Sequence, residues 1–231
     1  YFDQKNLVKN KNFKALVTTG PTREYLDPVR YISNESSGKQ GYEVALALKK
    51  LGIKTKLIAG PSNLISSKDL KIKKIISAKE MMNEVKKSLP VDIAVCAAAV
   101  ADFKPINKNK NKIKKNTPNI DNIKLEKNPD ILDYLSKNNE ARPKIVVGFS
   151  AETENVIQNS KIKIKEKYCD LIIANDVSKK DSGFNSEYNK VSIIDREGKI
   201  KSISKNKKSY IANTIAKIIL DKLLMNDKNI N

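Results

Sequence analysis

A loop rich in serine and glycine is the first part of the chain whose residues could do chemistry. It spans residues 33–41, after an apolar run at residues 13–19 and just before a helix-like segment. A phosphate can bind at a helix N-terminus because free backbone N–H groups and the helix dipole point toward it. The predicted phosphate or substrate loop consists of Gly20, Thr22, Ser36, Ser37, Gly38 and Lys39. A structural alternative is a serine N-cap, with glycine for close packing of the helix on a strand.

A run of small residues that ends in a carboxylate follows the apolar segment 91–97. Residues 97–102 read AAAVAD. Small side chains let a flat ring or a ribose lie against the backbone, and Asp102 can accept hydrogen bonds from hydroxyl groups. Tight packing of a helix on the sheet is the alternative. Because this run and the serine-glycine loop both follow strand-like segments, the sequence predicts a crevice at the carboxyl ends of parallel strands.

Two groups of lysines could supply positive charge to an anionic ligand. Lys112, Lys114 and Lys115 lie in a polar segment without periodicity. Lys163 and Lys167 have the i,i+4 spacing that places two side chains on one helix face. Lysine suits phosphate charge, and a mobile lysine can close over a reactive anion. In so lysine-rich a chain, solvated surface charge is the alternative for both groups.

The composition excludes several kinds of active site. The 231 residues include 45 Lys plus Arg, 26 Asp plus Glu and no histidine, for a formal net charge of +19. Without histidine there is no Ser-His triad, no His-ligated zinc and no imidazole base. Such a charge is typical of nucleic-acid-binding proteins. The lysines, however, are spread along the chain without interleaved aromatic residues, so we expect a solvated surface and no nucleic-acid partner.

The sequence contains no segment that resembles a membrane span or a signal peptide. Its longest apolar stretch falls well short of the ~18–20 residues that cross a bilayer. The first fourteen residues are polar and basic, unlike a secretory signal. Cys96 and Cys169 lie in apolar runs, which favours buried, reduced thiols. We therefore expect a cytoplasmic protein with no membrane partner.

Alternating strand-like and helix-like segments predict the fold class. The expected strands are 13–19, 54–59, 71–76, 91–97, 144–149 and 170–174, and the expected helices are 39–51, 78–88, 130–136 and 153–167. This alternation implies right-handed parallel crossovers, and therefore an α/β, Rossmann-like, doubly wound and mainly parallel sheet. A β-hairpin at 190–194 and 199–203 and a helix at 207–224 follow it.

One domain is expected, at residues 13–225. Residues 1–12 resemble a linker or tail, and residues 226–231 a frayed C-terminus. Residues 103–127 are polar and lysine-rich, without a hydrophobic period. So long a segment inside a compact domain indicates a functional lid.

Together the motifs resemble the phosphopantothenate–cysteine ligase (phosphopantothenoylcysteine synthetase) family, the ligase half of bacterial bifunctional coenzyme A biosynthesis proteins. The resemblance covers residues 13–224. It rests on GPTRE, DPVRYISN-x-SSGK-x-G, AAAVADF-x-P, KIKK, KNPDIL, VGF-x-AET, K-x-x-x-K-x-x-D-LI-x-AND and F-N-S-x-x-N-x-V, in that order. Several of these motifs are long and unrelated in composition, so chance is a poor explanation.

The resemblance implies an enzyme that joins 4′-phosphopantothenate to L-cysteine. Bacterial members use CTP with Mg²⁺: the substrate carboxylate attacks the α-phosphate to give an acyl-cytidylate and pyrophosphate, and the cysteine amine then displaces CMP. The resemblance also implies a homodimer. A flavin-dependent decarboxylase half, fused or separate, would hold the flavin, so no flavin is expected in this half.

The resemblance further implies roles for individual residues. Asn34 and Lys112 would be catalytic: Asn34 holds the acyl-cytidylate, and Lys112 is a lid lysine that stabilises charge during acyl transfer. Asp102 would bind the nucleotide sugar. The implied nucleotide-binding residues are Cys96, Ala97, Ala98, Asp102, Lys112, Pro129, Asp130, Ile131, Leu132, Phe149, Lys163 and Lys167. The metal ligands are left unassigned.

Three residues depart from the family pattern, at Thr19, Glu35 and Ser150. Of these, Glu35 adds negative charge beside the predicted catalytic asparagine and could weaken anion binding. A Rossmann-type NAD(P) oxidoreductase is an alternative function. It is disfavoured because Gly38-x-x-Gly41 is only part of the G-x-G-x-x-G fingerprint and the second strand ends without an acidic residue. A nucleic-acid-binding module, the other alternative, predicts a steep salt dependence of binding.

Overall fold

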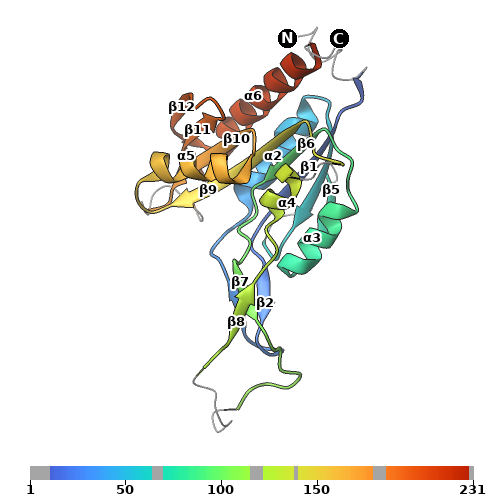
Figure 1. Ribbon diagram of the computed structural model, residues 1–231, viewed down its shortest axis with the longest axis vertical. Helices are drawn as coiled ribbons and strands as arrows, with labels where there is room; N and C mark the ends of the chain where they lie inside the picture. The colour runs from blue at the N-terminus through green and yellow to red at the C-terminus, as the bar shows by residue number, and fades with distance from the viewer. Residues whose placement is uncertain (1–10, 64–69, 115–121, 138–139, 179–185, 229–231) are drawn as a thin grey trace.

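The computed structural model describes residues 11–63, 70–114, 122–137, 140–178 and 186–228. An eight-stranded sheet lies between two layers of helices (Figure 1), in the strand order β12-β11-β10-β9-β6-β1-β4-β5. These strands are β1 (Lys14–Thr19), β4 (Lys54–Ala59), β5 (Lys71–Lys74), β6 (Ile93–Cys96), β9 (Ile145–Glu152), β10 (Leu171–Asp176), β11 (Tyr188–Asp195) and β12 (Ile200–Lys207). The helices are α2 (Lys39–Lys50), α3 (Ala78–Lys86), α4 (Ile131–Lys137), α5 (Val156–Lys167) and α6 (Lys208–Lys228).

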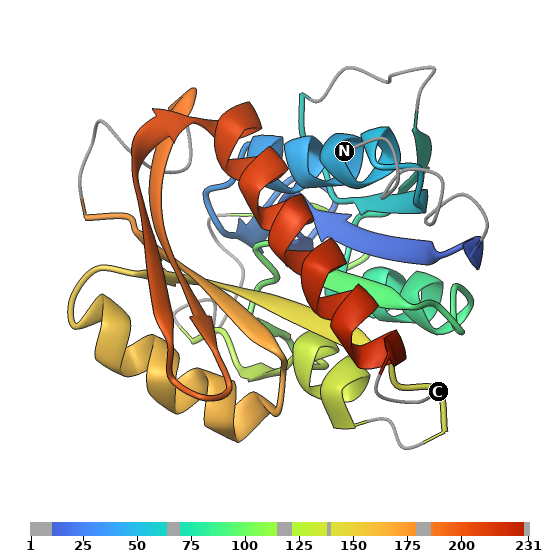
Figure 2. The ribbon, with the colours of Figure 1, turned by 90° about the horizontal axis from the view of Figure 1, so that it is seen from above.

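The central strand β1 sends its side chains alternately into two hydrophobic cores. Ala15 and Val17 pack with α2 and α6, whereas Leu16 packs with α3, α4 and α5. Successive residues of a strand point to opposite faces, so a strand covered on both faces needs a continuous apolar run. Figure 2 shows α6 crossing one face of the sheet beside α2. The predicted α/β, mainly parallel fold is confirmed.

The chain winds outward from β1 in two directions. On one side, β1 pairs in parallel with β4, and β4 pairs in parallel with β5. The chain then returns to the other side of β1, where β6 pairs with β1, β9 with β6 and β10 with β9, all in parallel. The strand order therefore reverses between β1 and β6, where Thr18 is in register with Cys96. In such sheets, ligand crevices lie outside the carboxyl ends of the strands at this point.

The predicted C-terminal hairpin and helix are also present. β11 and β12 pair antiparallel and extend the sheet beyond β10. Helix α6 buries Ile211, Ile215 and Ile219 completely. It continues to Lys228, although the sequence predicts fraying from residue 226. In this last turn Asp227 forms ion pairs with Lys11 and Lys144, both at 2.8 Å, and these pairs hold the turn against the core.

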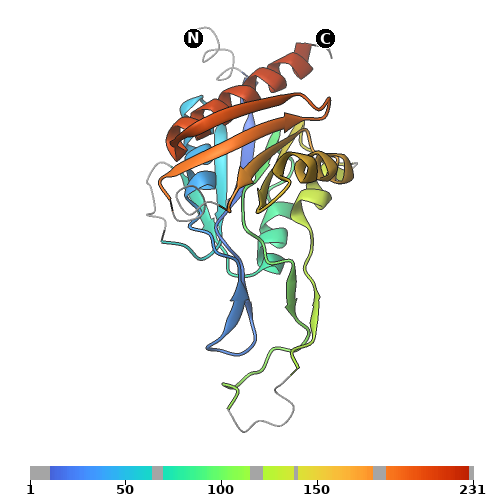
Figure 3. The ribbon, with the colours of Figure 1, turned by 90° about the vertical axis from the view of Figure 1, so that its left-hand side faces the viewer.

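Two short ribbons extend away from the sheet (Figures 1 and 3). β2 (Arg23–Tyr25) pairs antiparallel with β3 (Tyr31–Ser33), and β7 (Phe103–Pro105) with β8 (Leu125–Lys127). The sequence predicts no strand in either segment, and this prediction is wrong. Three-residue strands are too short to show a periodicity, because their stability comes from pairing with a partner strand. The predicted lid begins and ends in the second ribbon, and residues 115–121 lie outside the described residues.

Both cysteines are free, with Cys169 buried and Cys96 half-buried. Burial raises the pKa of Cys169 to about 11 and also raises that of Cys96. Neither thiol is therefore poised to act as a thiolate nucleophile near neutral pH.

Within the described ranges, no helix combines the length and the apolar composition needed to cross a membrane.

Candidate functional site

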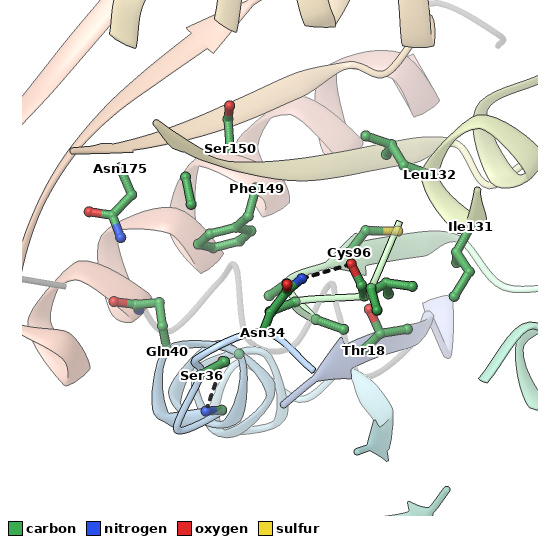
Figure 4. A pocket seen from close by; sticks show the side chains of 18 of the residues that line it. Thr18, Asn34, Ser36, Gln40, Cys96, Ile131, Leu132, Phe149, Ser150 and Asn175 are labelled. Atoms are coloured by element: carbon green, nitrogen blue, oxygen red, sulfur yellow. Dashed lines mark hydrogen bonds between the residues drawn. The ribbon is translucent and has the colours of Figure 1, made fainter. Parts of the chain in front are cut away.

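A cleft of about 810 Å³ opens at the switch point between β1 and β6. It is lined by the carboxyl ends of β1, β6, β9 and β10, by the N-termini of α2 and α6, and by residues of α4 and α5. Figure 4 shows how Asn34, Phe149 and Asn175 approach this space from separate elements. A cavity of this size can enclose a small-molecule ligand as large as a nucleotide.

Most of the predicted site residues line this cleft. They are Asn34, Ser36, Ser37, Gly38, Lys39, Cys96, Ala97, Ala98, Asp102, Pro129, Asp130, Ile131, Leu132, Phe149, Lys163 and Lys167. Gly20, Thr22 and Lys112 are not part of the lining. The fold thus brings together motifs that lie far apart in the sequence.

The serine-glycine loop forms one wall of the cleft. Gly38 is the N-cap of α2 and has a φ of 73°, in the left-handed region that favours glycine. The Thr19 hydroxyl donates to the Gly38 carbonyl at 2.6 Å, and the Gly38 N–H donates to Ser36 Oγ at 3.3 Å. The N-cap of α2 is a glycine without a side-chain cap, so the serine N-cap alternative is wrong in that form, although Ser37 Oγ accepts the Lys39 N–H at 3.5 Å. The first turn of α2 also carries no acidic residue, which leaves its dipole available to an anion.

Gly41 allows α2 to pack closely on the ends of β1 and β6. A Cβ atom at this position would lie 2.5 Å from Thr19 Oγ1 and 3.1 Å from the Ala97 Cβ. A larger residue would require the helix or its neighbours to shift. Glycine for close helix–strand packing, the other part of the structural alternative, is therefore confirmed. This packing places the N-terminus of α2 directly beside the cleft.

The small-residue run after β6 forms the floor of the cleft. Its backbone is tied to the segment after β1, because the Ala99 N–H donates to the Gly20 carbonyl at 2.9 Å. Thr22 Oγ1 accepts a hydrogen bond from the Ala101 N–H at 3.0 Å, and Thr22 is completely buried. Gly20 and Thr22 therefore stabilise the floor through hydrogen bonds but do not line the cleft. This placement corrects the prediction that they bind a phosphate directly.

Two asparagine side chains are attached to the same floor. Asn34 Nδ2 donates to the Val100 carbonyl at 3.0 Å. Asn128 Nδ2 donates to the Ala101 carbonyl at 2.8 Å, and the Asn128 N–H donates to the Asp102 carbonyl, also at 2.8 Å. Asp102 is an exposed residue in the cleft lining. Its carboxylate is thus accessible to hydroxyl groups of a ligand.

Charged side chains of α4 and α5 form one end of the cleft. Lys167 Nζ lies 2.8 Å from Asp130 Oδ2, and Asp130 Oδ1 accepts the Asp133 N–H at 2.8 Å. Burial acts to raise the pKa of Asp130, but this N–H and the charges of Lys167 and Lys163 outweigh it and lower the pKa. The hydrogen bond to Asp130 raises the pKa of Lys167. Lys163 and Lys167 both face the cleft, as their spacing predicts.

Two buried amide oxygens in the cleft lining have no hydrogen-bond partner within the described residues. They are Oδ1 of Asn128 and Oδ1 of Asn175. An unsatisfied buried acceptor costs about 1–3 kcal/mol, so each oxygen is a candidate acceptor for a donor group of a ligand or of a water molecule. The sequence motifs KNPDIL and AND contain these asparagines but assign them no role. Gln40, Asn189 and Lys208 also line the cleft and were missed, because their placement depends on the packing of α2, β11 and α6.

Lys112 lies on the lid segment and outside the cleft lining. It is exposed, and the next residue, Ile113, is bound to the β2–β3 turn. The Ile113 N–H donates to Asp27 Oδ2 at 3.1 Å, and the Arg30 guanidinium donates to the Ile113 carbonyl. The structure therefore does not bring Lys112 together with the other predicted site residues.

Asp27 anchors the lid segment through a buried carboxylate. Its Oδ1 accepts the N–H groups of Val29 at 2.7 Å and Arg30 at 2.9 Å, and its Oδ2 pairs with the Arg30 guanidinium at 2.8 Å. Burial acts to raise the pKa of Asp27, but the backbone donors and Arg30 outweigh it and hold the pKa below its usual range. The DPVR motif contains Asp27, although sequence reasoning assigned it no role.

Comparisons with known proteins agree with this fold. The bifunctional coenzyme A biosynthesis protein CoaBC of Borreliella burgdorferi is 43% identical over 220 residues, covering 94% of this chain and 54% of that protein. The chain thus spans about half the length of this curated relative. The crystal structure of the C-terminal domain of a CoaBC protein is 31% identical, with a TM-score of 0.76, and the match covers 93% of this chain and 96% of that one.

A more distant solved structure shares the fold. It is a Cab2 mutant in complex with phosphopantothenate-cysteine, with 17% identity and a TM-score of 0.71; the match covers 98% of this chain and 94% of that one.

A protein-family comparison covers nearly the whole domain. Residues 10–223 match the family described as the DNA/pantothenate metabolism flavoprotein C-terminal domain. The match includes every element that lines the cleft. The chain therefore belongs to the DNA/pantothenate metabolism flavoprotein C-terminal domain family.

Proposed function

We propose that this chain is a CTP-dependent phosphopantothenate–cysteine ligase. One observation carries the proposal: a single cleft gathers lysines, a helix N-terminus and asparagine side chains, which are the groups needed where a carboxylate meets a triphosphate. The CoaBC relatives, named for coenzyme A biosynthesis, and the Cab2 complex with phosphopantothenate-cysteine support the choice of substrates.

In the first proposed step, a carboxylate oxygen of 4′-phosphopantothenate attacks the α-phosphorus of CTP. A bond forms between this oxygen and phosphorus, the bond to the bridging oxygen breaks, and pyrophosphate leaves. The two reactants repel each other, so catalysis depends on cations and on positioning. No side chain must act as a nucleophile or a base in this step, which is consistent with a chain that has no histidine.

The cleft suggests where the parts of CTP bind. We place the nucleoside at the α4–α5 end, against residues 96–98, 129–132 and Phe149, with Asp102 accepting a ribose hydroxyl and Lys163 and Lys167 supplying charge. The N-terminus of α2, with Ser36–Lys39, contributes amide donors. Lys112 takes part only after the lid changes its position relative to the cleft.

In the second proposed step, the cysteine amine attacks the acyl carbon of the acyl-cytidylate. A carbon–nitrogen bond forms, the carbon–oxygen bond to the phosphate breaks, CMP leaves, and the extra proton of the amine passes to solvent. Asn34 is attached to the floor through the Val100 carbonyl. We propose that Asn34 holds the acyl-cytidylate in the orientation that this attack requires.

Mg²⁺ enters this proposal together with the nucleotide. Across the described ranges, no three Cys, Asp or Glu side chains are grouped in a way that could hold a metal ion. In this proposal the ion is held mainly by phosphate oxygens and water, as Mg²⁺ commonly is. When bound, it would neutralise triphosphate charge.

A homodimer is the assembly that we propose. Large apolar side chains are exposed on the two ribbons and the adjoining lid segment, at Val29, Tyr31, Phe103, Ile106, Ile123 and Leu125. A group of exposed apolar residues on projecting strands commonly marks a protein–protein interface. Leu125→Lys should give a monomer in sedimentation experiments at concentrations where the parent chain is a dimer. Met225→Lys, at an exposed apolar residue on α6, should leave the dimer intact.

The proposed localisation and partner follow from the substrates and from the relatives. A reaction that consumes CTP and free cysteine suits the cytoplasm, which is the localisation we propose. The CoaBC relatives are named bifunctional, and we propose a flavin-dependent decarboxylase half, fused or separate, as the partner that holds the flavin.

Pyrophosphate release tests the proposed function directly. The chain should release pyrophosphate when 4′-phosphopantothenate, Mg²⁺ and CTP are present, and more slowly with ATP. Addition of cysteine should increase the rate and give the amide product. Folded protein that releases no pyrophosphate with either nucleotide would contradict the proposal.

A further inference from the structure

The cleft has a second charged end, where the proposed function leaves a buried lysine without a role. Figure 4 shows Ile131 and Leu132 at one end of the cleft and Gln40 and Asn175 toward the other. Lys208, the first residue of α6, lines the cleft near Gln40. It therefore lies away from the α4–α5 end.

Lys208 is unusual among the lysines of this chain because it is only 5% exposed. Its N–H donates to the Glu187 carbonyl at 3.0 Å, and its carbonyl accepts Gln40 Nε2 at 3.2 Å. Burial, reinforced by the charge of Lys39, lowers the pKa of Lys208 to about 8. A buried ammonium group is costly unless an anion compensates its charge. The charge of Glu187 acts on this ammonium group, and the position of Lys208 in the cleft wall makes it accessible to an anionic ligand.

Lys39 and Glu187 complete the charge cluster. Lys39, the first residue of α2, forms an ion pair with Glu187, whose side chain is 71% exposed. Exposed ion pairs contribute little free energy, so an incoming anion can displace Glu187 readily. The charges of Lys39 and Lys208 both act on this carboxylate and lower its pKa. Burial and the nearby Glu187 raise the pKa of Glu43 of α2, against the effect of Lys50.

We propose that Lys208 and Lys39 form a subsite for a phosphoryl group, with Glu187 as the counter-ion that this group displaces. The inference rests on the proposed function, in which both candidate sources are phosphorylated: the phosphate ester of 4′-phosphopantothenate and the β- and γ-phosphates of CTP. A dianionic phosphoryl group matches two ammonium groups, and the N-termini of α2 and α6 add favourable dipoles. The subsite would hold the substrate end that lies farthest from the proposed nucleoside pocket.

Steady-state kinetics of Lys208→Met test the subsite and identify its ligand. Methionine preserves length and tolerates burial but removes the charge. The KM for one phosphorylated substrate should rise about tenfold or more. Lys207→Met is the matched control, because Lys207 is exposed and outside the cleft lining; it should change neither KM by more than about twofold.

The two phosphoryl sources predict different results. A higher KM for 4′-phosphopantothenate alone assigns the subsite to its phosphate ester. A higher KM for CTP, together with weaker inhibition by pyrophosphate, assigns it to the triphosphate. If folded Lys208→Met protein keeps both KM values, the subsite is overturned, and a fall in kcat alone overturns it as well.

Binding of inorganic pyrophosphate separates the subsite from the ligase function. Pyrophosphate should raise the Tm of the parent chain and of Lys207→Met, and raise that of Lys208→Met much less. If pyrophosphate binding depends on Lys208 but no product forms, the subsite stands and the proposed function fails. If product forms but Lys208→Met binds pyrophosphate normally, the function stands and the subsite fails.

Glu187→Gln provides a second test that does not depend on the folding of Lys208→Met. Glu187 is exposed, so its replacement should leave the fold intact. Removal of the competing carboxylate should tighten pyrophosphate binding about two- to fivefold. Unchanged or weaker binding would contradict the displacement of Glu187 by a phosphoryl group.

Discussion

The floor of the cleft and the lid segment serve the same proposed reaction, but they are built in different ways. The floor consists of small residues whose backbone is hydrogen-bonded across the switch point, as from Ala99 to Gly20. The lid segment extends beyond the sheet, carries the exposed Lys112, and is fastened through Asp27 and Arg30 to the β2–β3 turn.

This difference separates two requirements of the reaction. A binding surface must be preorganised, because each side chain that orders on binding costs free energy. A lysine can instead lie on a segment outside the core, because its charge is needed only while the acyl phosphate forms. In the proposed reaction, recognition would thus lie at the sheet, and the predicted lid cation lies outside the cleft lining. Changes in the floor should therefore affect folding, and changes in the lid should affect chemistry.

Lys112→Gln should have the largest effect on chemistry. The rate of acyl-cytidylate formation, measured as pyrophosphate release, should fall about 10²–10³-fold, because a charge that stabilises the reacting phosphate is lost. The Tm should not change, because Lys112 is exposed. Lys110→Gln, on the same segment, is the control and should stay near the parent rate. Normal pyrophosphate release by Lys112→Gln would place the key cation elsewhere.

Asn34→Asp should impair the second step more than the first. A carboxylate beside the acyl-cytidylate repels its phosphate and loses the amide donor that now binds the Val100 carbonyl. Overall turnover should fall about 10²-fold, and bound acyl-cytidylate should accumulate. Acid quenching followed by mass spectrometry would detect the intermediate. Turnover like that of the parent chain would exclude this role for Asn34.

Gly41→Ala should destabilise the floor region without removing any proposed catalytic group. The new Cβ would lie within 2.7 Å of both side-chain atoms of Thr19, Oγ1 and Cβ, that face it. The free energy of unfolding should fall by about 1–3 kcal/mol in urea titrations. Lys50→Ala, at an exposed position of the same helix, should change it by less than about 0.5 kcal/mol. Equal stability of the two variants would show that α2 can shift away from β1 at little cost.

Asp27→Asn should have the smallest effect and should appear mainly as a change in pH dependence. The pKa of Asp27 is lower in the folded protein than in the unfolded chain, so the unfolded chain binds more protons in acid. The stability from this carboxylate is present above its unfolded pKa of about 4 and is lost as the pH falls toward the folded pKa. The amide that replaces the carboxylate cannot ionise, so the acid dependence of Tm should become shallower.

The control for this prediction is Glu154→Gln, at an exposed carboxylate outside the cleft lining. It should leave the acid dependence unchanged. Pyrophosphate release by Asp27→Asn should fall only severalfold, because Arg30 still donates to the Ile113 carbonyl. An unchanged acid dependence of Tm would show that folding does not lower the pKa of Asp27.

Local patterns were sufficient to predict the main elements of the sheet. The strand predicted at 54–59 coincides with β4, and the helix predicted from residue 39 begins where α2 begins. The ribbons β2–β3 and β7–β8 were missed. Three residues cannot show a period of two, and the contacts that form these strands come from outside each strand.

The site was predictable in composition but not in arrangement. Lys163 and Lys167 share a helix face, which i,i+4 spacing alone indicates. Thr22 and Ser36 are both hydroxyl residues near a strand end, yet one is buried behind the floor and the other lines the cleft. Nothing in the local sequence distinguishes them, because the difference arises from the hydrogen bond between Thr22 and Ala101.

The sequence by itself determined the α/β alternation, the absence of histidine chemistry and the motifs that supply the cleft. Those properties depend on residue type and short-range spacing, which the chain carries locally. Only the tertiary structure decided that Lys39 and Lys208 share one end of the cleft, that Asn175 keeps a buried oxygen unpaired among the described residues, and that Lys112 stands apart. Burial and charge proximity arise between residues far apart in the chain, and they exist only once the sheet and its helices have packed together.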